Sequence, residues 1–366
     1  MISRKTVPLV KVLMPPRDLL MQKLEQTLYS GMIGEGQEVY DFEAEFAAQF
    51  GLSRALATNS GTAALHMALL LAGARSGREV ITTAMTAEPT NTAILQTGAV
   101  PVFADVRVDT GNLDPVSVAE SITERTCAIC VVHYAGYPAA LAELRDLADA
   151  NGIALIEDCA HALGARYMDE GIGTVGDSAI FSFQAIKHMT TVDGGMLRLR
   201  DTYQENLAKR LRWFGLTKGV ARTEIDISQA GYKYNMSNVT ATIGRAQLSV
   251  IDAAIERHID NGRYYDAAFA QLPHVVPATI ECGAQPSYWL YTLLCDDADG
   301  VMRALESIGV SASKLHRPNH YHSVFEPYRT DLPQLEQFYR RLVHLPCGWW
   351  VTDDDRERII ETIAKG

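Results

Sequence analysis

The chain has 366 residues, of which 47% are hydrophobic and 21% are charged, as in an ordinary globular protein. This length predicts two domains and a core large enough to fold without disulfide bonds. The formal net charge of −11 excludes a general affinity for nucleic acid or for an anionic membrane, because both need a basic face. A local pocket of backbone N–H groups can still bind a small anionic ligand.

The cysteines and the N-terminal segment favour a cytoplasmic protein. The six cysteines are scattered, and although Cys127 and Cys130 form a C-x-x-C pair, no second pair has zinc spacing. We therefore expect core thiols in a reducing compartment. The N-terminal segment has no secretory signal pattern, and no window reaches the ~18 apolar residues of a transmembrane helix.

Strands and helices alternate through the first two thirds of the sequence. Residues 38–50 form the first predicted helix, because Val39, Phe42 and Phe46 share one face and Gly51 stands where a helix ends. Further helices are predicted at 61–72, 88–97 and 139–150. Strands are predicted at 54–58, 79–83, 101–106, 127–134, 153–158, 178–183 and 195–200. Apolar strands separated by helices predict an α/β fold with a mostly parallel sheet, flanked by helices on both faces.

This alternation stops near residue 245. A long helix at about 246–270 is followed by an isolated strand at 288–295 and by helices at 299–308 and 353–364. We therefore predict a large α/β domain over residues 1–245 and a smaller C-terminal α+β domain over residues 246–366.

The segment NSGTAAL places Ser60, Gly61 and Thr62 at a junction between a strand and a helix. The free N–H groups and the positive dipole of a helix N-terminus form a ready site for phosphate. Gly61 lets an oxygen approach the backbone closely, since it has no Cβ. The alternative is that Ser60 or Thr62 simply caps the helix.

Two further residues follow predicted strands. Asp158 ends a buried strand, where ligand groups gather in parallel sheets. A buried carboxylate needs a cationic partner, and a protonated pyridine nitrogen would serve; the alternative is a helix cap or a surface ion pair. Lys187 follows the strand 178–183, and burial there would lower the pKa of its amine and make it a nucleophile. The alternative is a solvated loop lysine.

A helix start suited to phosphate, then an acid after a strand, then a lysine after a strand form a specific pattern. With these features in this order, the sequence resembles the sugar aminotransferases of the DegT/DnrJ/EryC1/StrS family. The resemblance covers nearly the whole chain. The matching stretches are NSGTAALHMAL, PVFADVRVDTGNLDP, VVHYAGYPAAL, IEDCAHALGA, VGDSAIFSFQAIKHMTTVDGGML, GYKYNMSNVTATIG and LPCGWWVTDDD. It implies the fold-type I architecture of pyridoxal 5′-phosphate (PLP) aminotransferases, a homodimer, and transfer of an amino group from L-glutamate to a keto sugar carried on a nucleotide.

The resemblance also implies roles for individual residues. Lys187 matches the lysine that holds PLP as a Schiff base and then shuttles protons, and Asp158 matches the carboxylate on the pyridine nitrogen. His161 matches the residue beside the ring hydroxyl. Gly61, Thr62 and Ser182, with Ser60 beside them, match the phosphate site. Asn235 matches an asparagine that reaches the phosphate from the other subunit, and His316, Asn319 and His322 lie where the family contacts the sugar nucleotide.

One position departs from the family pattern. The family places an aromatic residue against the pyridine ring, but the aligned stretch AMTAEPTN has Ala87 there. Either another aromatic side chain takes this role or the cofactor has no stacked ring on that side.

Three other motifs are discounted. GIGTVG at 171–176 satisfies G-x-G-x-x-G but runs into a strand instead of opening a helix, so we expect a turn and no dinucleotide. SASK at 311–314 lacks the companion motifs of a β-lactamase. No histidine spacing of the H-E-x-x-H type occurs, and we expect no metal.

We therefore predict a cytoplasmic nucleotide-sugar aminotransferase that cycles PLP through pyridoxamine 5′-phosphate. Its substrate is expected to be a 4-keto-6-deoxy sugar for surface polysaccharide such as lipopolysaccharide O-antigen. One alternative is a dehydratase of the same family, although such relatives carry His in place of Lys187. The other is a regulator that binds PLP or sugar without catalysis.

Overall fold

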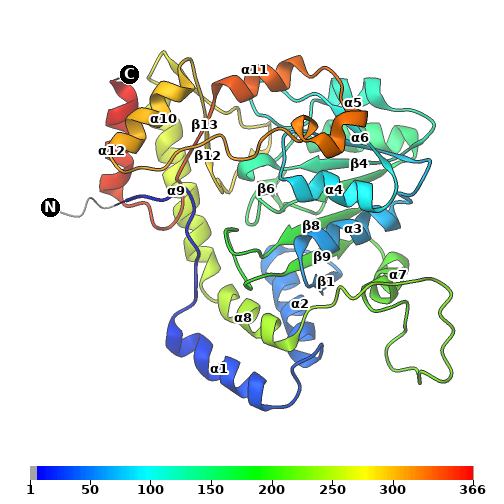
Figure 1. Cartoon of the computed structure of the whole chain (residues 1–366). Coiled ribbons are helices and arrows are strands. Elements are labelled where there is room, and N and C mark those ends of the chain that lie inside the picture. Colours follow the sequence, from blue (N-terminus) through cyan, green and yellow to red (C-terminus); the bar gives the residue numbers. More distant parts are fainter. Residues whose placement is uncertain (1–5, 366) are drawn as a thin grey trace.

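A computed structural model describes residues 6–365 of the chain (Figure 1). Its centre is a seven-stranded sheet in which β9 runs antiparallel to both its neighbours, while β8, β5, β4, β2 and β3 pair in parallel. The order across the sheet is β1 (Ala55–Thr58), β9 (Gly195–Leu199), β8 (Ser178–Ser182), β5 (Ala154–Asp158), β4 (Thr126–Val132), β2 (Glu79–Thr83) and β3 (Val100–Ala104). The predicted α/β class with a mostly parallel sheet is confirmed.

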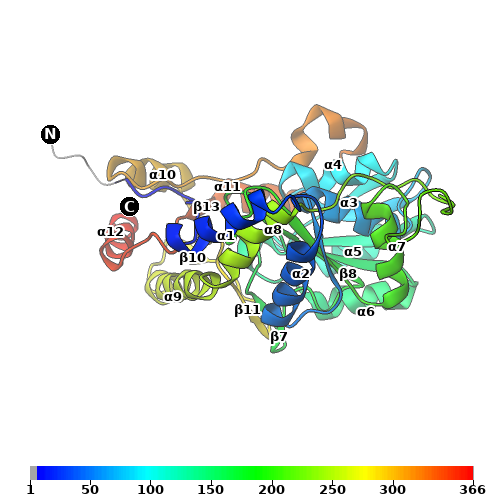
Figure 2. The same cartoon turned by 90° about the horizontal axis from the view of Figure 1, so that it is seen from below.

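Helices cover both faces of this sheet, because successive strand residues point to opposite sides. Leu155 of β5 packs into one core and Ile156 into the other. The first core is closed by α2 (Gln37–Phe50), α5 (Pro115–Ser121) and α6 (Leu141–Asn151). The second is closed by α3 (Gly61–Leu71), α4 (Glu88–Gln96) and α7 (Thr202–Arg212). Figure 2 shows α3 and α4 on one side of the sheet and α6 on the other.

The C-terminal part forms a third core around an antiparallel sheet of β10 (Val275–Pro277), β12 (Tyr291–Cys295) and β13 (Leu342–Leu345). Helices α10 (Ala298–Ser307), α11 (Pro333–Arg341) and α12 (Asp353–Ala364) belong to this part. A short third sheet joins β11 (Ala284–Gln285), β6 (Arg166–Tyr167) and β7 (Glu170–Gly171). Figure 1 shows α9 (Ile251–Phe269) leading from the large sheet into the C-terminal core.

One sequence prediction about this region was wrong, and another was confirmed with a later start. The strand expected to be isolated, β12, lies between two partners, β10 and β13. The long helix expected at about 246–270 is α9, but it begins at Ile251, because residues 246–248 end a separate helix, α8 (Asn238–Leu248). Ser237 caps the start of α8, and the Ser249 hydroxyl donates back to the Ala246 carbonyl at 2.7 Å, a local bond that competes with helix continuation. The domain boundary proposed at 245/246 therefore falls within α8 and stays a prediction.

The cysteines and the helices bear on two further expectations. All six cysteines are free thiols, and five are buried, with Cys127 and Cys130 both on β4. Over residues 6–365, none of the helices combines the length and the apolar character that crossing a membrane requires.

Candidate active site

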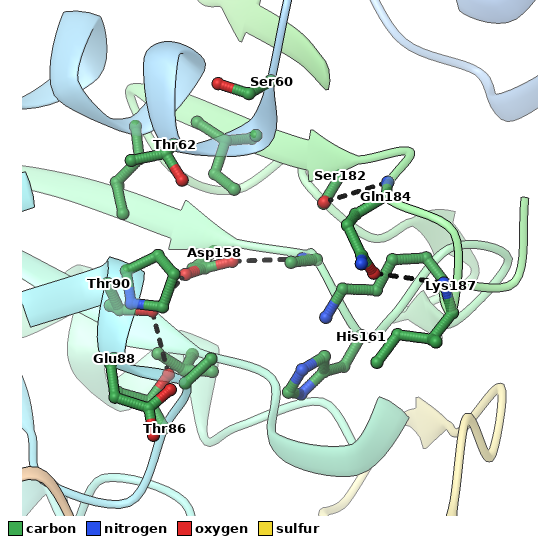
Figure 3. Close-up of a pocket in the computed structure, with 18 of the residues that line it drawn as sticks. Ser60, Thr62, Thr86, Glu88, Thr90, Asp158, His161, Ser182, Gln184 and Lys187 are labelled. Atoms are coloured by element: carbon green, nitrogen blue, oxygen red, sulfur yellow. Dashed lines mark hydrogen bonds between the residues drawn. The ribbon is translucent and has the colours of Figure 1, made fainter. Parts of the chain in front are cut away.

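The carboxyl ends of β5 and β8 and the N-terminus of α3 meet at a cavity of about 330 Å³, a size typical of small-molecule sites. Figure 3 shows Lys187, Asp158 and His161 pointing into the same space, with Ser60, Thr62 and Ser182 along one side. The described residues that line it are Ser60, Gly61, Thr62, Leu65, Thr86, Ala87, Glu88, Pro89, Thr90, Val132, Asp158, Ala160, His161, Ile180, Ser182, Gln184, Ile186, Lys187, Asp193, Gly194 and His316.

Lys187 lies in a compact turn after β8. Its backbone N–H donates to the Gln184 carbonyl at 3.0 Å, and the Ile186 N–H donates to the Gln184 side chain at 3.1 Å. Burial lowers the pKa of the Lys187 amine to about 8, although the nearby Asp158 carboxylate opposes this shift. The neutral fraction of the amine near physiological pH is therefore larger than that of a solvated lysine, which favours a nucleophile over a solvated loop lysine.

Asp158 faces this amine from the end of β5. Its carboxylate accepts hydrogen bonds from the Thr90 hydroxyl at 2.9 Å and from the Ala160 N–H at 3.1 Å. Burial raises the pKa of the Asp158 carboxyl, even though these two donors and the charge on Lys187 act in the opposite direction. The carboxylate is thus buried with less compensation than it needs, and a cationic ligand group in the cavity would supply the remainder.

Thr90→Val is expected to lower the free energy of unfolding at neutral pH by about 1–3 kcal/mol, because it removes a hydrogen bond to a buried charge and the 2.9 Å bond to the buried Thr86 hydroxyl. Chemical denaturation at pH 7 measures this difference. Thr92→Val is the matched control, since the Thr92 hydroxyl lies on the same helix and donates to Glu88 and Pro89 carbonyls instead. Equal effects of the two substitutions would show that the Thr90 bond does not support Asp158.

The start of α3 forms the opposite wall. Ser60 caps this helix by accepting from the Ala63 N–H at 3.0 Å, so the capping alternative holds for Ser60, and its own hydroxyl proton remains able to donate to a ligand. A Cβ on Gly61 would lie 2.8 Å from the Ser182 Cβ. Only glycine therefore lets the helix approach the end of β8, and the free N–H groups of its first turn can bind an anion such as phosphate.

His161 is a buried imidazole in the cavity wall. Both its ring nitrogens are buried without a hydrogen-bond partner among residues 6–365. Burial, and then the charge on Lys187, lower the pKa of His161 well below its usual range, so the ring is neutral and offers one donor and one acceptor. Two unpartnered polar atoms at one buried site indicate that a polar ligand belongs there.

Of the three residues expected to bind the sugar nucleotide, one lines the cavity, one lies beside it and one does not line it. His316 lines the cavity with a left-handed φ of 68°, burial lowers its pKa to about 4, and its Nε2 has no hydrogen-bond partner within the described chain. His322 lies beside the cavity, with Nε2 3.8 Å from Oε1 of Glu88. Asn319 does not line it, because its amide donates to the Thr86 carbonyl at 2.8 Å and accepts from Asn91 at 2.9 Å.

Asn235 does not line the cavity of its own chain. It forms a β-bridge with Thr58, and its side-chain oxygen accepts from the Lys233 amine at 2.8 Å. Its expected contact with the other subunit's cofactor stays a prediction.

Ala87 does line the cavity, as the residue before α4, and presents only a methyl group there. Its neighbours Thr86, Glu88 and Thr90 also line the cavity, and so does Gln184; none of these four was predicted as a site residue. The stretch AMTAEPTN contains the first three, but the prediction considered only its stacking position.

The glycines of GIGTVG surround a side chain of the protein itself. The Gly173 and Gly176 N–H groups donate to the Glu157 carboxylate, and His133 Nε2 lies 3.1 Å from it. The ligand atoms of His133, Glu157 and Cys159 lie within 4.8 Å of one another, the spacing of a metal site. Because Glu157 already accepts these hydrogen bonds, we interpret the cluster as a buried hydrogen-bond network behind Asp158.

Glu157→Gln is expected to lower the free energy of unfolding by about 3–5 kcal/mol at neutral pH, because it breaks a buried charged network. Burial alone would raise the pKa of Glu157, but the His133 and glycine hydrogen bonds lower it overall. The carboxylate therefore stabilises the fold above its unfolded-state pKa, and the stabilisation is lost as the pH falls through the lower folded-state pKa. Denaturation between pH 7 and pH 3 should show the two proteins converging. Exposed Glu124→Gln is the control, and an equal effect there would contradict this account.

Comparison with known proteins agrees with this geometry. The model of the DegT/DnrJ/EryC1/StrS aminotransferase family matches residues 17–364. The spore coat polysaccharide biosynthesis protein SpsC of Bacillus subtilis (strain 168) is 34% identical, over 94% of this chain and 93% of its own. The crystal structure of the sugar aminotransferase CalS13 from Micromonospora echinospora is 35% identical, with a TM-score of 0.94, and covers 98% of this chain and 100% of its own.

Spr1654 from Streptococcus pneumoniae is a third similar structure, 26% identical with a TM-score of 0.88 over 99% of this chain and 98% of its own, and it was solved in a PLP form. The family and this relative imply PLP as the cofactor. The residues present fit it, since the cavity holds a buried amine, the unpartnered nitrogens of His161 and a helix start that only Gly61 allows. The chain belongs to the DegT/DnrJ/EryC1/StrS aminotransferase family.

Proposed function

We propose that this chain is a PLP-dependent aminotransferase that moves an amino group from L-glutamate to the keto carbon of a nucleotide-linked sugar. One observation carries the proposal. The buried Lys187 amine faces the Asp158 carboxylate across a cavity whose far wall is the N-terminus of α3. An amine, an acid and a phosphate site in this arrangement suit PLP, whose aldehyde, pyridine nitrogen and phosphate need these three groups.

PLP supplies an aldehyde and a ring that accepts an electron pair from the substrate's Cα. Lys187 would hold the aldehyde carbon covalently through Nζ, with release of water. Asp158 would accept a hydrogen bond from the pyridine N–H and keep that proton in place. His161, being neutral, could donate to the ring oxygen, while Ser60, Thr62, Ser182 and the Gly61 N–H would hold the phosphate.

When its amine is free, Lys187 would have a second task as an acid–base group. With a pKa of about 8, Nζ can take a proton from the substrate and return it at a neighbouring carbon, since an acid–base group works best near the operating pH. The apolar side chains that line the cavity, such as Val132, Ile180 and Ile186, limit the access of water to the reacting groups.

The acceptor is proposed to be a 4-keto-6-deoxy sugar on a nucleotide, for a surface polysaccharide. Support comes from the names of the relatives, one a spore coat polysaccharide biosynthesis protein and one a sugar aminotransferase. His316 and His322 are proposed to contact the sugar nucleotide, with Asn319 supporting their segment. We also propose a homodimer in which Asn235 reaches the partner subunit's cofactor.

The test is to incubate the purified protein with PLP, L-glutamate and dTDP-, UDP- or GDP-linked 4-keto-6-deoxy sugars. The proposal expects visible absorbance that bleaches with glutamate, 2-oxoglutarate release, and a sugar product that has gained nitrogen by mass spectrometry. A product that has lost water would instead make the chain a dehydratase, and bound PLP indifferent to every amino donor would make it a binding protein.

One observation supports the first of these outcomes over the second. Lys187 stands where the dehydratases of the family carry His, and the neighbouring His188 does not line the cavity, since its Nε2 lies 3.1 Å from the Ser287 carbonyl. This favours transfer of the amino group.

A further inference from the structure

Trp289 contacts the candidate site from behind the cavity wall. Its indole N–H donates to the carbonyl of Ile186, the residue before Lys187, at 2.9 Å. The Lys187 amine lies 4.4 Å from the centre of the indole ring. The same ring stacks on His161, with ring centres 4.0 Å apart and planes at 18°. One side chain therefore contacts the turn that carries Lys187, its amine and the neighbouring imidazole.

The backbone around Trp289 is firmly held. The Ser287 N–H donates to the Gly136 carbonyl at 3.0 Å, and the Leu290 N–H donates to the Ala135 carbonyl at 3.2 Å. Gly136 has φ +96°, and a Cβ there would lie 2.7 Å from the Trp289 backbone nitrogen. A glycine in the stretch HYAGYP is thus what lets this segment reach the site, and the indole is fixed before any ligand binds.

The groups around the Lys187 amine leave few ways to stabilise its positive charge. Asp158 is the carboxylate that faces it. His161, His188 and His316 also surround it, but burial is the first cause that lowers the pKa of each. These imidazoles are neutral near pH 7, so none of them adds a positive charge that would repel the ammonium group. The face of an indole, which is negative, is then a second stabilising partner for an ammonium group.

We propose that Trp289 is a positioning residue for the amino-transfer reaction: its ring holds the Lys187 amine and His161 in place and stabilises the protonated amine. The role of these contacts in catalysis rests on the proposed function, whereas the contacts themselves do not depend on it. The stacked contact orients His161 toward the cavity, and the N–H bond to Ile186 fixes the turn on which Lys187 stands.

A purely structural role is the competing interpretation, because Trp289 is 2% exposed and belongs to the C-terminal core. Phe269 provides a matched control. It is buried in the same core and contacts Tyr265 and Tyr291. Phe269→Leu should destabilise the fold much as Trp289→Leu does, without touching the site.

The test measures the pKa of Lys187 in the full-length protein before PLP is added. Reductive methylation across a pH series, followed by peptide mass spectrometry, gives the pKa from the rate at Lys187. Trp289→Leu is expected to lower it by about one unit, the scale of a desolvated cation–π contact. Trp289→Phe, which keeps an aromatic face, should lower it by less than half as much, and Phe269→Leu should leave it unchanged. An unchanged or raised pKa in Trp289→Leu, or an equal shift in Phe269→Leu, would overturn the proposal.

A second readout uses the PLP-loaded enzyme. The pH at which its visible absorbance changes should differ from the wild-type value in Trp289→Leu. It should lie close to the wild-type value in Trp289→Phe and equal it in Phe269→Leu. No movement in Trp289→Leu would count against the positioning role. Failure of the wild-type protein to bind PLP would instead contradict the proposed function, and the Lys187 pKa shift would still be measurable.

Discussion

Lys187→Ala is expected to reduce amino-group transfer by at least about 10³-fold, because it removes both the nucleophile that binds PLP and the acid–base group that moves the proton. The visible absorbance of the PLP-loaded protein should disappear with it. Steady-state turnover and the absorption spectrum of the purified variant measure the two effects. Small amines such as ethylamine should restore part of the activity, since they replace the missing group in the space that Lys187 leaves.

The control is Lys209→Ala, which removes an exposed lysine paired with Glu205 on α7. Its turnover and spectrum should equal those of the wild type. Normal turnover in Lys187→Ala would remove the basis of the proposed function, because no other lysine lines the cavity among the described residues.

Asp158→Asn is expected to lower turnover by about 10²-fold or more while the protein still binds PLP through Lys187 and the phosphate site. The amide cannot hold the pyridine nitrogen in its protonated form, so the ring accepts electrons less well. The magnitude is that of losing one preorganised electrostatic partner in a buried site. Turnover with L-glutamate, together with the PLP content of the purified variant, measures this separation of chemistry from binding.

The same substitution should not destabilise the chain before PLP is added. Burial raises the pKa of the Asp158 carboxyl, which means that its ionised form costs folding free energy at pH 7. An asparagine oxygen in the place of Oδ1 can still accept from the Ala160 N–H, and its amide group in the place of Oδ2 can donate to the Thr90 hydroxyl oxygen. We therefore expect an equal or higher Tm in Asp158→Asn, as for other residues that serve function at the expense of stability.

Exposed Asp149→Asn, which breaks only an ion pair with Arg145, is the control and should change neither turnover nor Tm appreciably. A large drop in Tm for Asp158→Asn would contradict the assignment, since it would make Asp158 a structural residue.

The large sheet could be predicted from the sequence because its signals are local. The prediction for β2 coincides with Glu79–Thr83, and α2 ends at Phe50, just before Gly51, which has the left-handed φ of 66° that a glycine at this position suggested. In both cases a run of apolar residues is bounded by residues that stop it, and no distant contact is needed to place the element.

The C-terminal part was harder, because its structure depends on pairing between distant segments. β12 was expected to be isolated, since β10 is a three-residue strand and β13 lies about 50 residues later in the sequence. The helix α1 (Arg17–Tyr29) was not predicted. About half of its residues are polar and only Leu20 and Thr27 are buried, so its apolar pattern is weak.

The residues of the candidate site likewise fall into those with a local sequence signal and those that depend on distant contacts. Asp158 ends a strand, Lys187 and Gly61 each follow one, and the topology of a parallel sheet brings such positions together. Trp289 comes from the C-terminal core, more than 100 residues after Lys187, and no local pattern connects the two. Asn319 shares the motif of His316, but its amide is used by the protein itself, which only the folded structure reveals.

The most direct test of the central claim is to reduce the PLP-loaded protein with borohydride and to map the modified peptide by mass spectrometry. Our account predicts a single pyridoxyl group, attached to Lys187 in the peptide that contains FSFQAIK. A pyridoxyl group on another lysine, or none on any lysine of a protein that has bound PLP, would contradict it.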